Sequence, residues 1–530
     1  MSTRALIAVA LTLLAASAVG AAAPDKSDQL EQMAREKFGA LSHAELLLVR
    51  SAPTRDLEWA GPHDEPDDPS NDPLHAQSWG PERTIRAPLL VWLASDPAAT
   101  RLVHPSGAGI KAARIAGQLD LSYQNVPFPL TLIRSAISEG VDISNAHLRG
   151  LDLRASATGP ITGDMAVVDG DVRLTFGNYE QTSFYRASIG GSLDFSASRV
   201  QTAEVPAISG IEASIGGDAI FHQGTSASGP VSFRTNGIVD FRLVRIGHAL
   251  SFNHAQFYGR QDNGLNAERA VIQGPLYWVA IGLTPHTQLD LADARAAELW
   301  DDRLSWPAPG NLILSGFQYG GFGGDSPSDA ESRLAWLARQ PRGFHAQPYA
   351  ELAKALAAAG ENDDAIAVEI AQRVAQRREG GLGRAERAWN ALLQVTIGYG
   401  FIPLRALWWI IGFVALGTVL FQWGYAMRVV SPTEEPAYQS FMQSGTTPPH
   451  YPRFNAFVYS LENFLPVVDL HQGEYWRPNP VHGAPGNHPA GGGRACAGVL
   501  LRWYLWLHIL AGWILTPLLA AGLSGLIHVG

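Results

Sequence analysis

Two adjacent carboxylates, Asp301 and Asp302 in the segment LWDDRL, have side chains suited to acid–base chemistry on a sugar chain. Glycoside hydrolysis needs two carboxyl groups that flank the scissile bond, about 5–9.5 Å apart. Neighbouring residues of a strand point to opposite faces, so only one of these two would face a groove. The pair suggests a polysaccharide-modifying enzyme as one hypothesis and two structural or solvated carboxylates as the other.

A second polar group, formed by His471, Glu474, His482 and His488, lies in one loop, with Asp469 close by. Imidazole and carboxylate groups are common ligands of zinc and related metals. The spacing is loose, however, and Gly and Pro dominate the loop, which is typical of a solvated connector. The loop is therefore interpreted either as a metal site or as a solvated connector.

Aspartates recur at the outward position of short apolar segments, at Asp120, Asp142 and Asp194. A row of carboxylates on one sheet could bind a cation or a sugar. Stacked strands are only about 4.8 Å apart, however, and like charges in register repel each other. Later segments carry uncharged residues at this position: Ile220, Ser251 and Tyr277. The alternatives are a surface acidic row that binds a ligand and a solvated face.

Other chemistry is excluded or unsupported by the sequence. The chain contains no GxSxG, HExxH or P-loop motif, and no strand–GxGxxG–helix unit. Its single cysteine, Cys496, excludes an intramolecular disulfide. The net charge of −10 gives no indication of a basic surface that would bind nucleic acid. We therefore expect no cofactor and no nucleic-acid partner.

The elements that position these residues form a repeat across the middle of the chain. Its template is small-x-apolar-x-Gly-x-apolar-x-apolar, and the third position recurs at steps of 22, 31, 21, 26, 31 and 26 residues: Ile115, Ile137, Val168, Ile189, Ile215, Ile246 and Ile272. A short motif with such a step indicates a solenoid, and the alternation indicates strands with one buried face. We predict a mainly β fold, a right-handed β-solenoid over 105–322, in which coils of different length carry loops suited to binding.

The flanks of the repeat have other compositions. Residues 1–23 combine Arg4 with an apolar run and small residues, which is typical of a secretory signal peptide, with an uncleaved anchor as the alternative. Residues 24–104 are predicted to form a helical, irregular N-terminal cap with an acidic Pro-rich loop. Residues 325–395 are predicted to form a helical hairpin that links the solenoid to a membrane module at 396–530.

Two apolar segments in that module, 406–427 and 503–527, are long enough to span a membrane. The segment 454–470 lies between them and carries Glu462 and Asp469, which predicts an interfacial or re-entrant helix. Arginines before the first span favour a cytoplasmic flank, whereas the signal peptide favours export. We predict a two-span protein of the bacterial inner membrane with a periplasmic solenoid.

Six segments carry a resemblance to a known family: SWGPERTIRA (78–87), RLAWLARQP (333–341), QPYAELAKAL (347–356), TIGYGFIPLRALWW (396–409), FNAFVYSLENFLPVVDLHQGEYW (454–476) and WLHILAGWILTPLLAAGLSGL (506–526). The chain resembles bacterial membrane proteins that pair a Gly-rich β-solenoid with a C-terminal two-helix membrane module. They are sometimes labelled pentapeptide-repeat-like proteins or membrane-associated oxidoreductases. The resemblance implies the fold and the membrane, and it brings no established activity.

These observations lead to one expected function and two alternatives. We expect a membrane-anchored envelope protein whose solenoid is a binding or scaffolding surface for a glycan or an envelope protein. The first alternative is a polysaccharide-modifying enzyme on the same scaffold. The second is a transport or channel-like role for the C-terminal module, with 454–470 as a re-entrant segment.

Overall fold

The structure is a computed structural model that describes residues 25–54, 56–62, 64–65, 68–203, 206–259, 263–402, 404–479 and 492–524. The chain divides into two compact units, Met1–Val368 and Glu369–Gly530. The signal peptide predicted at 1–23 and the predicted ligands His482 and His488 lie outside the described residues.

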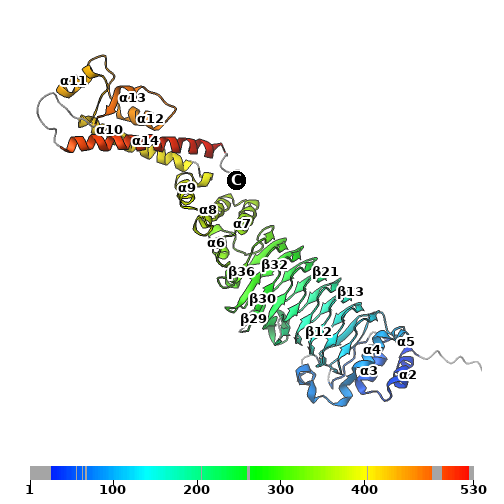
Figure 1. Ribbon diagram of the computed structural model, residues 1–530. Helices are drawn as coiled ribbons and strands as arrows, with labels where there is room; N and C mark the ends of the chain where they lie inside the picture. The colour runs from blue at the N-terminus through cyan, green and yellow to red at the C-terminus, as the bar shows by residue number, and fades with distance from the viewer. Residues whose placement is uncertain are drawn as a thin grey trace, which may run out of the picture. The chain divides into compact units, whose positions relative to one another are not determined.

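The first unit contains a parallel β-solenoid whose coils have four sides, seen as stacked arrows in Figure 1. A coil visits four parallel sheets, here named A to D, in turn. Sheet A contains β2 (Ala108–Lys111), β6 (Leu130–Ile133), β10 (Leu151–Asp152), β14 (Val172–Arg173), β18 (Leu193–Asp194), β22 (Ala219–Ile220), β28 (Leu250–Ser251), β32 (Pro275–Trp278) and β35 (Glu298–Asp301). Sheet B contains β1 (Thr84–Arg86), β3 (Arg114–Ala116), β7 (Ala136–Ile137), β11 (Ala157–Thr158), β15 (Asn178–Tyr179), β19 (Arg199–Val200), β25 (Arg234–Thr235) and β29 (Gln256–Phe257).

The other two sheets follow the same plan. Sheet C contains β4 (Leu119–Asp120), β8 (Val141–Asp142), β12 (Ile161–Thr162), β16 (Thr182–Ser183), β20 (Ile208–Ser209), β26 (Ile238–Asp240), β30 (Asn263–Asn266), β33 (Thr287–Asp290) and β36 (Leu312–Ile313). Sheet D contains β5 (Asn125–Val126), β9 (His147–Leu148), β13 (Val167–Val168), β17 (Ser188–Ile189), β21 (Ser214–Ile215), β27 (Arg245–Ile246), β31 (Val271–Ile272), β34 (Arg295–Ala296) and β37 (Gln318–Tyr319). The predicted β-solenoid is therefore confirmed.

The sides of a coil succeed one another at five-residue steps in the most regular part of the solenoid. Buried Ile143, Leu148, Leu153 and Thr158 lie on four successive sides. A full coil there takes 21 residues, as the pairing of Leu151 with Val172 shows. The inward residue of each side is apolar or small, and all four sides therefore share one sequence pattern.

The structure differs from the sequence prediction in how the repeat copies align. Ile115 and Ile137 lie in sheet B, whereas the five later copies, from Val168 to Ile272, lie in sheet D. The 31-residue step from Ile137 to Val168 is thus about one and a half coils. The equal step from Ile215 to Ile246 has another cause, because that coil carries an inserted antiparallel hairpin of β23 (Gly224–Ser226) and β24 (Gly229–Val231).

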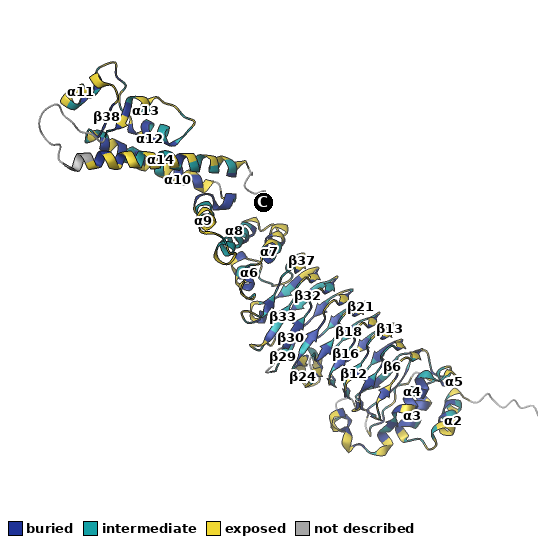
Figure 2. Cartoon of the chain, viewed as in Figure 1, coloured by how far each residue is buried: buried dark blue, intermediate teal, exposed yellow. Residues whose placement is uncertain are grey.

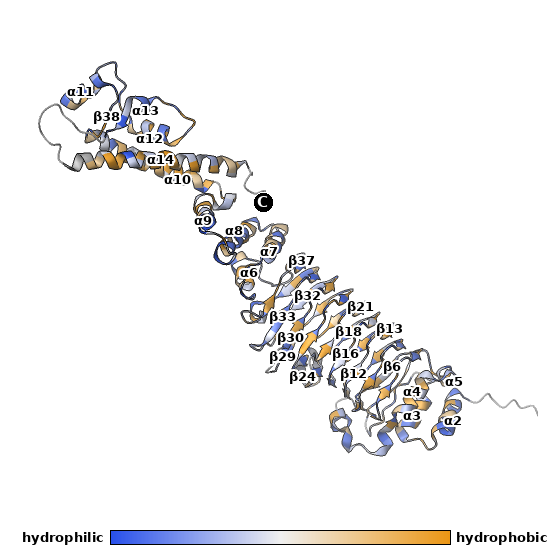
Figure 3. Ribbon diagram, in the orientation of Figure 1, coloured by the Kyte–Doolittle hydropathy of each residue, from blue (hydrophilic) through white to orange (hydrophobic). Residues whose placement is uncertain are grey.

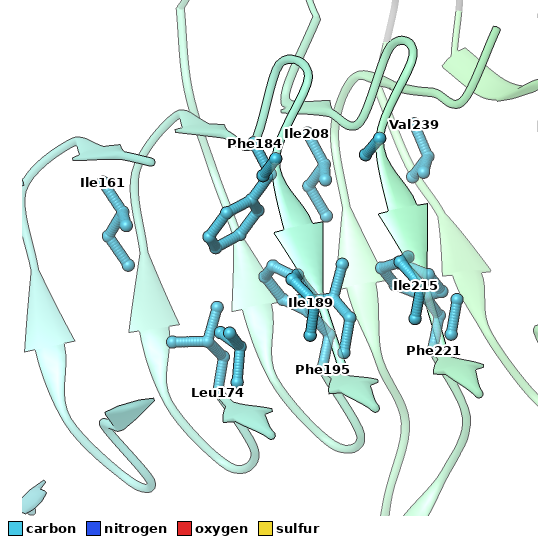
Figure 4. Packing of buried hydrophobic residues seen from close by; sticks show 14 of the residues in the cluster. Ile161, Leu174, Phe184, Ile189, Phe195, Ile208, Ile215, Phe221 and Val239 are labelled. Atoms are coloured by element: carbon cyan, nitrogen blue, oxygen red, sulfur yellow. The ribbon is translucent and has the colours of Figure 1, made fainter. Parts of the chain in front are cut away.

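The interior of the coils is a continuous column of apolar side chains, part of which is shown as sticks in Figure 4. Many residues of the strands that supply these side chains are buried, dark blue in the cartoon of Figure 2. Phe221 is at its centre. Its ring stacks on Phe195 and Phe252 with centroid distances of 5.2 and 4.8 Å, and it meets Phe233 and Phe241 edge to face. Residues of neighbouring coils thus contact each other in register, which is why the coils stabilise one another.

Helices lie at the N-terminal end of the solenoid. They are α2 (Lys26–Phe38), α3 (His43–Ser51), α4 (Ala87–Ser95) and α5 (Pro97–Thr100), with 3-10 turns η1 (Pro69–Asn71), η2 (Pro73–Ser78) and η3 (Pro81–Arg83). Glu45 in α3 is buried and accepts two hydrogen bonds from the guanidinium of Arg86, at 2.7 and 2.8 Å, and one from its backbone N–H. This pair connects α3 to the first strand of sheet B.

Three helices follow the last coil: α6 (Ala330–Leu337), α7 (Ala346–Ala358) and α8 (Asn362–Glu379). The side-chain amide of Gln347 accepts a hydrogen bond from the Gly316 N–H and donates one to the Phe317 carbonyl. These bonds join α7 to the corner between β36 and β37. The solenoid therefore has helices packed at both of its ends.

The second unit is largely helical. It contains α9 (Arg384–Ile397), η5 (Gly398–Gly400), α10 (Leu404–Ala426), α11 (Glu435–Ser444), α12 (Ala456–Phe464), α13 (Gln472–Tyr475), α14 (Gly492–Leu523) and a small sheet of β38 (Val430–Pro432) and β39 (Trp476–Pro478). Among the described residues, α10 and the Cys496–Leu523 part of α14 are long and apolar enough to cross a membrane. Both are predominantly hydrophobic in Figure 3.

Helix α12, the centre of the predicted 454–470 segment, packs against both α10 and α14. The buried imidazole of His508 lies 3.0 Å from the Ser460 carbonyl through Nε2 and 3.3 Å from the Tyr504 hydroxyl through Nδ1. Gly417 and Gly512 permit the contact, because an added Cβ would lie 2.3 Å from Ser460 Oγ and 1.7 Å from the Phe464 carbonyl oxygen. Small residues of both long helices thus accommodate α12.

Candidate binding groove

Asp301 and Asp302 serve the fold in two different ways. The Asp301 side chain is 2% exposed and forms a bidentate ion pair with Arg333 at 2.7 and 2.8 Å. The indole N–H of Trp306 donates a third hydrogen bond to it at 2.8 Å. Asp301 therefore contributes a buried link between β35 and α6 instead of an open carboxylate.

Asp302 begins the 3-10 turn η4 (Arg303–Ser305). Its carboxylate accepts hydrogen bonds from the backbone N–H groups of Ala280, Leu304 and Ser305. Burial favours the neutral carboxyl, but these donors outweigh it and hold the pKa of Asp302 below its ordinary range. A general acid needs a raised pKa, so this environment is unlike that of a catalytic acid.

The described members of the predicted metal group are His471 and Glu474, both exposed. His471 Nδ1 lies 3.4 Å from an Asp469 carboxylate oxygen. Across the part of the chain that the structure describes, no three His, Cys, Asp or Glu side chains gather in a way that could hold a metal ion.

The predicted acidic row is divided between two sides of the solenoid. Asp120 and Asp142 are neighbours on sheet C, whereas Asp194 lies on sheet A between Arg173 and Ile220. Each of the three carboxylates accepts the backbone N–H of the residue two positions later, at 2.8–2.9 Å. Aspartates at this position stabilise turns, and here they stabilise the corner that follows each strand.

The hydrogen bonds at these corners also affect ionisation. The hydroxyl and the backbone N–H of Ser122 both donate to Asp120 and hold its pKa below the ordinary range. The corner turns a few residues later through a left-handed residue, such as Tyr123 at φ 59° or Asn145 at φ 56°. The aspartates therefore have a structural role that Asp-x-Ser in the sequence already indicates.

Positively and negatively charged residues are distributed unequally between the four sides of the solenoid. The outward residues of sheet C include four aspartates and no cation: Asp120, Asp142, Asp240 and Asp290. The outward row of sheet B, from β3 to β29, has three arginines and no carboxylate: Arg114, Ala136, Ala157, Asn178, Arg199, Arg234 and Gln256. This row is not evident in the sequence, because repeat copies that share one motif belong to different sides of the solenoid.

Sheet B forms the floor of a groove with a volume of about 890 Å³. Ala157 and Asn178 lie in the floor, with Arg114 and Arg199 towards its two ends. The segment of η2 forms one wall and residues 201–203 contribute to another. Small floor residues between larger ones thus produce the depression.

A second hollow of about 440 Å³ adjoins the first at the corner between sheets A and B. Pro73 and Asn178 line both hollows. The second is also lined by Arg134, Arg154, Phe176 and the inserted hairpin, residues 225–227. The two hollows together form one extended groove, which we call the sheet B groove.

The walls are fixed by contacts within the first unit. Ala76 and Trp79 pack on Ala136 of sheet B. The Arg83 guanidinium stacks on Trp79 with its Cζ 3.7 Å from the ring centroid, and it donates to the carbonyls of Ser70 and Ala112. The η2 wall is therefore held against the sheet by a buried arginine.

The three arginines of the outward row on sheet B are differently constrained, and Arg234 lies next to the groove instead of lining it. Arg114 donates to the Thr84 hydroxyl at 2.9 Å, and Arg199 donates to the Tyr258 hydroxyl at 3.0 Å. Arg234 is exposed, lies beside Arg199 in register and has no hydrogen bond or ion pair with a residue that the structure describes. Guanidinium groups pair with carboxylates and phosphates in a bidentate manner. The groove is thus suited to an extended ligand with anionic groups.

The properties of the groove are inferred from its own residues and not from a related protein. No family model matches the chain, and no curated protein and no solved structure matches it.

Proposed function

We propose that the protein is a membrane-anchored component of the bacterial envelope whose sheet B groove binds an extended acidic glycan. The observation that carries this proposal is the outward row of three arginines without a carboxylate on sheet B, two of which, Arg114 and Arg199, line a groove of about 890 Å³. Of the residues that the structure describes, only Asp72 and Glu180 contribute carboxylates to the linings of its two hollows.

The shape and the lining favour a glycan over a folded protein partner. The floor consists of small side chains without a large apolar anchor, among them Ala157, and Asn178 and Ser138 offer hydrogen-bonding groups there. Phe176 is partly exposed in the adjoining hollow, where a sugar ring could stack on it. A protein interface normally has an apolar core with buried aromatic anchors.

Membrane attachment is supported by the outer faces of the two long helices. Trp408 on α10 and Trp513 on α14 are 75% and 62% exposed, and Val419 and Leu500 are similarly uncovered. Such large apolar surfaces are unfavourable in water and are covered by lipid in a bilayer. The sequence resemblance to solenoid-bearing membrane proteins adds the bacterial inner membrane to the proposal.

Charge reversal in the sheet B row is expected to weaken binding of an acidic glycan by about 10²- to 10⁴-fold, because two charge-assisted hydrogen bonds are lost and each is worth roughly 1.5–3 kcal/mol. The variant is Arg199→Glu/Arg234→Glu in the full chain in detergent. Binding of polygalacturonate is measured by calorimetry, with its neutral methyl ester as the reference ligand.

The matched control is Arg245→Glu/Arg295→Glu, which makes the same change in net charge on sheet D. Binding that is equal in both double variants, or equal for the acid and its ester, would contradict the groove proposal. Release of new reducing ends from the polymer would instead support the polysaccharide-modifying enzyme, and Asp302→Asn tests whether that carboxylate contributes.

We further propose that the solenoid lies on the periplasmic side, as the signal-peptide pattern at 1–23 suggests. Cys496 is the only cysteine, so a Cys496→Ala background with Ser228→Cys gives one exposed thiol on the inserted hairpin. A membrane-impermeant maleimide should label this thiol in intact spheroplasts. Labelling that requires lysis would reverse the proposed topology.

A transport role of the second unit is the second candidate, and the position of α12 favours it. A short helix packed against two long apolar helices is typical of a re-entrant segment. Solute or ion flux in vesicles that contain the full chain, lost when Gly512→Val displaces α12, would support this role.

A further inference from the structure

Helix α9 is amphipathic, and its N-terminal half, residues 384–389, is exposed. Trp389 and Val395 are both 52% exposed, and Ala385 and Ala388 lie on the same helical face. Arg387 lies on the polar side, and Arg384 lies at the border between the polar and apolar sides. A helix that exposes a tryptophan face flanked by arginines has the composition of an element that lies in a membrane interface.

The position of α9 relative to α10 is fixed by hydrogen bonds within the second unit. The Arg405 guanidinium donates to the Gln394 carbonyl, and the Trp409 indole donates to the Val395 carbonyl at 3.2 Å. Tyr399, in the left-handed conformation at φ 59°, donates its hydroxyl proton to Asn390 at 2.7 Å. These contacts keep α9 at the start of α10, beside the exposed Leu404 and Trp408.

The charge of this region is strongly positive. Residues 373–405 contain six arginines and two glutamates, whereas residues 428–502, between the two long apolar segments, contain five arginines and five carboxylates. Arg378, Arg384 and Arg387 are exposed and have no ion pair with any described residue. The end of α10 that carries α9 is therefore the cationic end of the unit.

Arg377 adds an independent observation in α8. Its Nη1 atom is buried and has no hydrogen-bond partner among the described residues. A buried cationic nitrogen without an acceptor is costly, and an anionic oxygen would relieve that cost. The same region thus combines exposed unpaired arginines with one buried nitrogen that needs an acceptor.

We infer that α9 and the arginines around it form a binding surface for anionic phospholipid, with Trp389 inserted among the headgroups and the guanidinium groups on the phosphates. The inference rests on the proposed membrane attachment. It goes further in giving the anchor a lipid preference that the two apolar helices alone would not have. Each arginine near an anionic surface contributes about fivefold to binding.

The test follows α9 in the full chain with a spin label at Ala388→Cys in a Cys496→Ala background. The chain is reconstituted in nanodiscs of phosphatidylcholine alone or with phosphatidylglycerol. The label is expected to be immobile and accessible to oxygen in the anionic discs and mobile in the neutral ones. Arg384→Gln/Arg387→Gln is expected to lower the docked-to-undocked ratio in anionic discs by about 25-fold, whereas Arg245→Gln/Arg295→Gln on sheet D should leave it unchanged.

The possible outcomes separate the two proposals. A chain that enters both kinds of disc with the same label spectrum retains its membrane attachment and overturns the lipid inference. A chain that enters neither disc overturns the membrane attachment itself. Inorganic phosphate added to neutral discs distinguishes the sources of the anion, because docking by free phosphate would show that no lipid is required.

Discussion

Replacing Arg333 with methionine is expected to destabilise the C-terminal end of the solenoid by about 3–5 kcal/mol. The Arg333 side chain is fully buried, and it holds Asp301 through two hydrogen bonds while its guanidinium lies 3.6 Å from the Phe322 ring centroid. Removing the arginine leaves a buried carboxylate with only the Trp306 indole as a side-chain donor. An uncompensated buried charge is the source of the large expected loss.

The loss should be local, because each coil of a solenoid contacts only its neighbours. Hydrogen exchange in the full chain should therefore accelerate by about 10²- to 10³-fold in β35 and β37 and remain unchanged in β12 and β16. Arg303→Met, which removes an exposed pair with Asp329, is the control and should change exchange very little. The double variant Asp301→Leu/Arg333→Met should recover most of the protection, and a double variant as unprotected as Arg333→Met would contradict this account.

Replacing Phe221 with alanine is expected to cost about 3–5 kcal/mol in the middle of the solenoid. Phe221 is fully buried, and its ring contacts four other phenylalanine rings from its own and neighbouring coils. Alanine would leave a cavity that the backbone cannot close, because the strand spacing is fixed by the hydrogen bonds of four sheets. Interrupting the aromatic column should therefore weaken the coils on both sides of it.

Pulse proteolysis of the full chain across a urea series measures this effect. Phe221→Ala should shift cleavage within the solenoid to lower urea, and Phe221→Leu should shift it less because it leaves a smaller cavity. Tyr123→Ala replaces an aromatic residue that is 77% exposed at a corner, and it should not shift cleavage. Equal shifts for Phe221→Ala and Tyr123→Ala would show that the column does not contribute as proposed.

The solenoid could be predicted because its pattern is strictly local. Each side needs one inward apolar residue and a corner, and Gly, Asp and Ser at the corners are visible in the sequence. The identity of a side could not be predicted, since Ile137 and Val168 occupy equivalent motifs on different sheets. Only the length of the coils, altered by insertions such as the 224–231 hairpin, decides which residues stack.

Because the side on which each motif lies could not be predicted, the groove could not be predicted from the sequence. Asp120, Asp142 and Asp194 were visible as a series, but the structure places them on two sheets, where they stabilise corners. Arg199 and Arg234 are separated by 35 residues and become neighbours because the coil between them is longer than the regular 21 residues, in part through the inserted hairpin. Long-range adjacency of this kind is a property of the winding and not of any short motif.

Several segments that carry the family resemblance have structural tasks in this chain. In SWGPERTIRA, Arg83 and Arg86 attach the N-terminal helical segment to the first coil. In RLAWLARQP, Arg333 attaches α6 to the last strand of sheet A, and Arg339 donates to the Pro307 carbonyl. These two segments therefore fasten the ends of the solenoid, and neither lines the sheet B groove.

The direction of the backbone hydrogen bonds has a mechanical consequence. They run from coil to coil along the solenoid axis, so tension between its two ends would load them lengthwise and break one coil's bonds before the next. Each released coil of 21 residues would add about 70 Å of extended chain. The solenoid would then lengthen one coil at a time under tension, because each coil is held only by its neighbours.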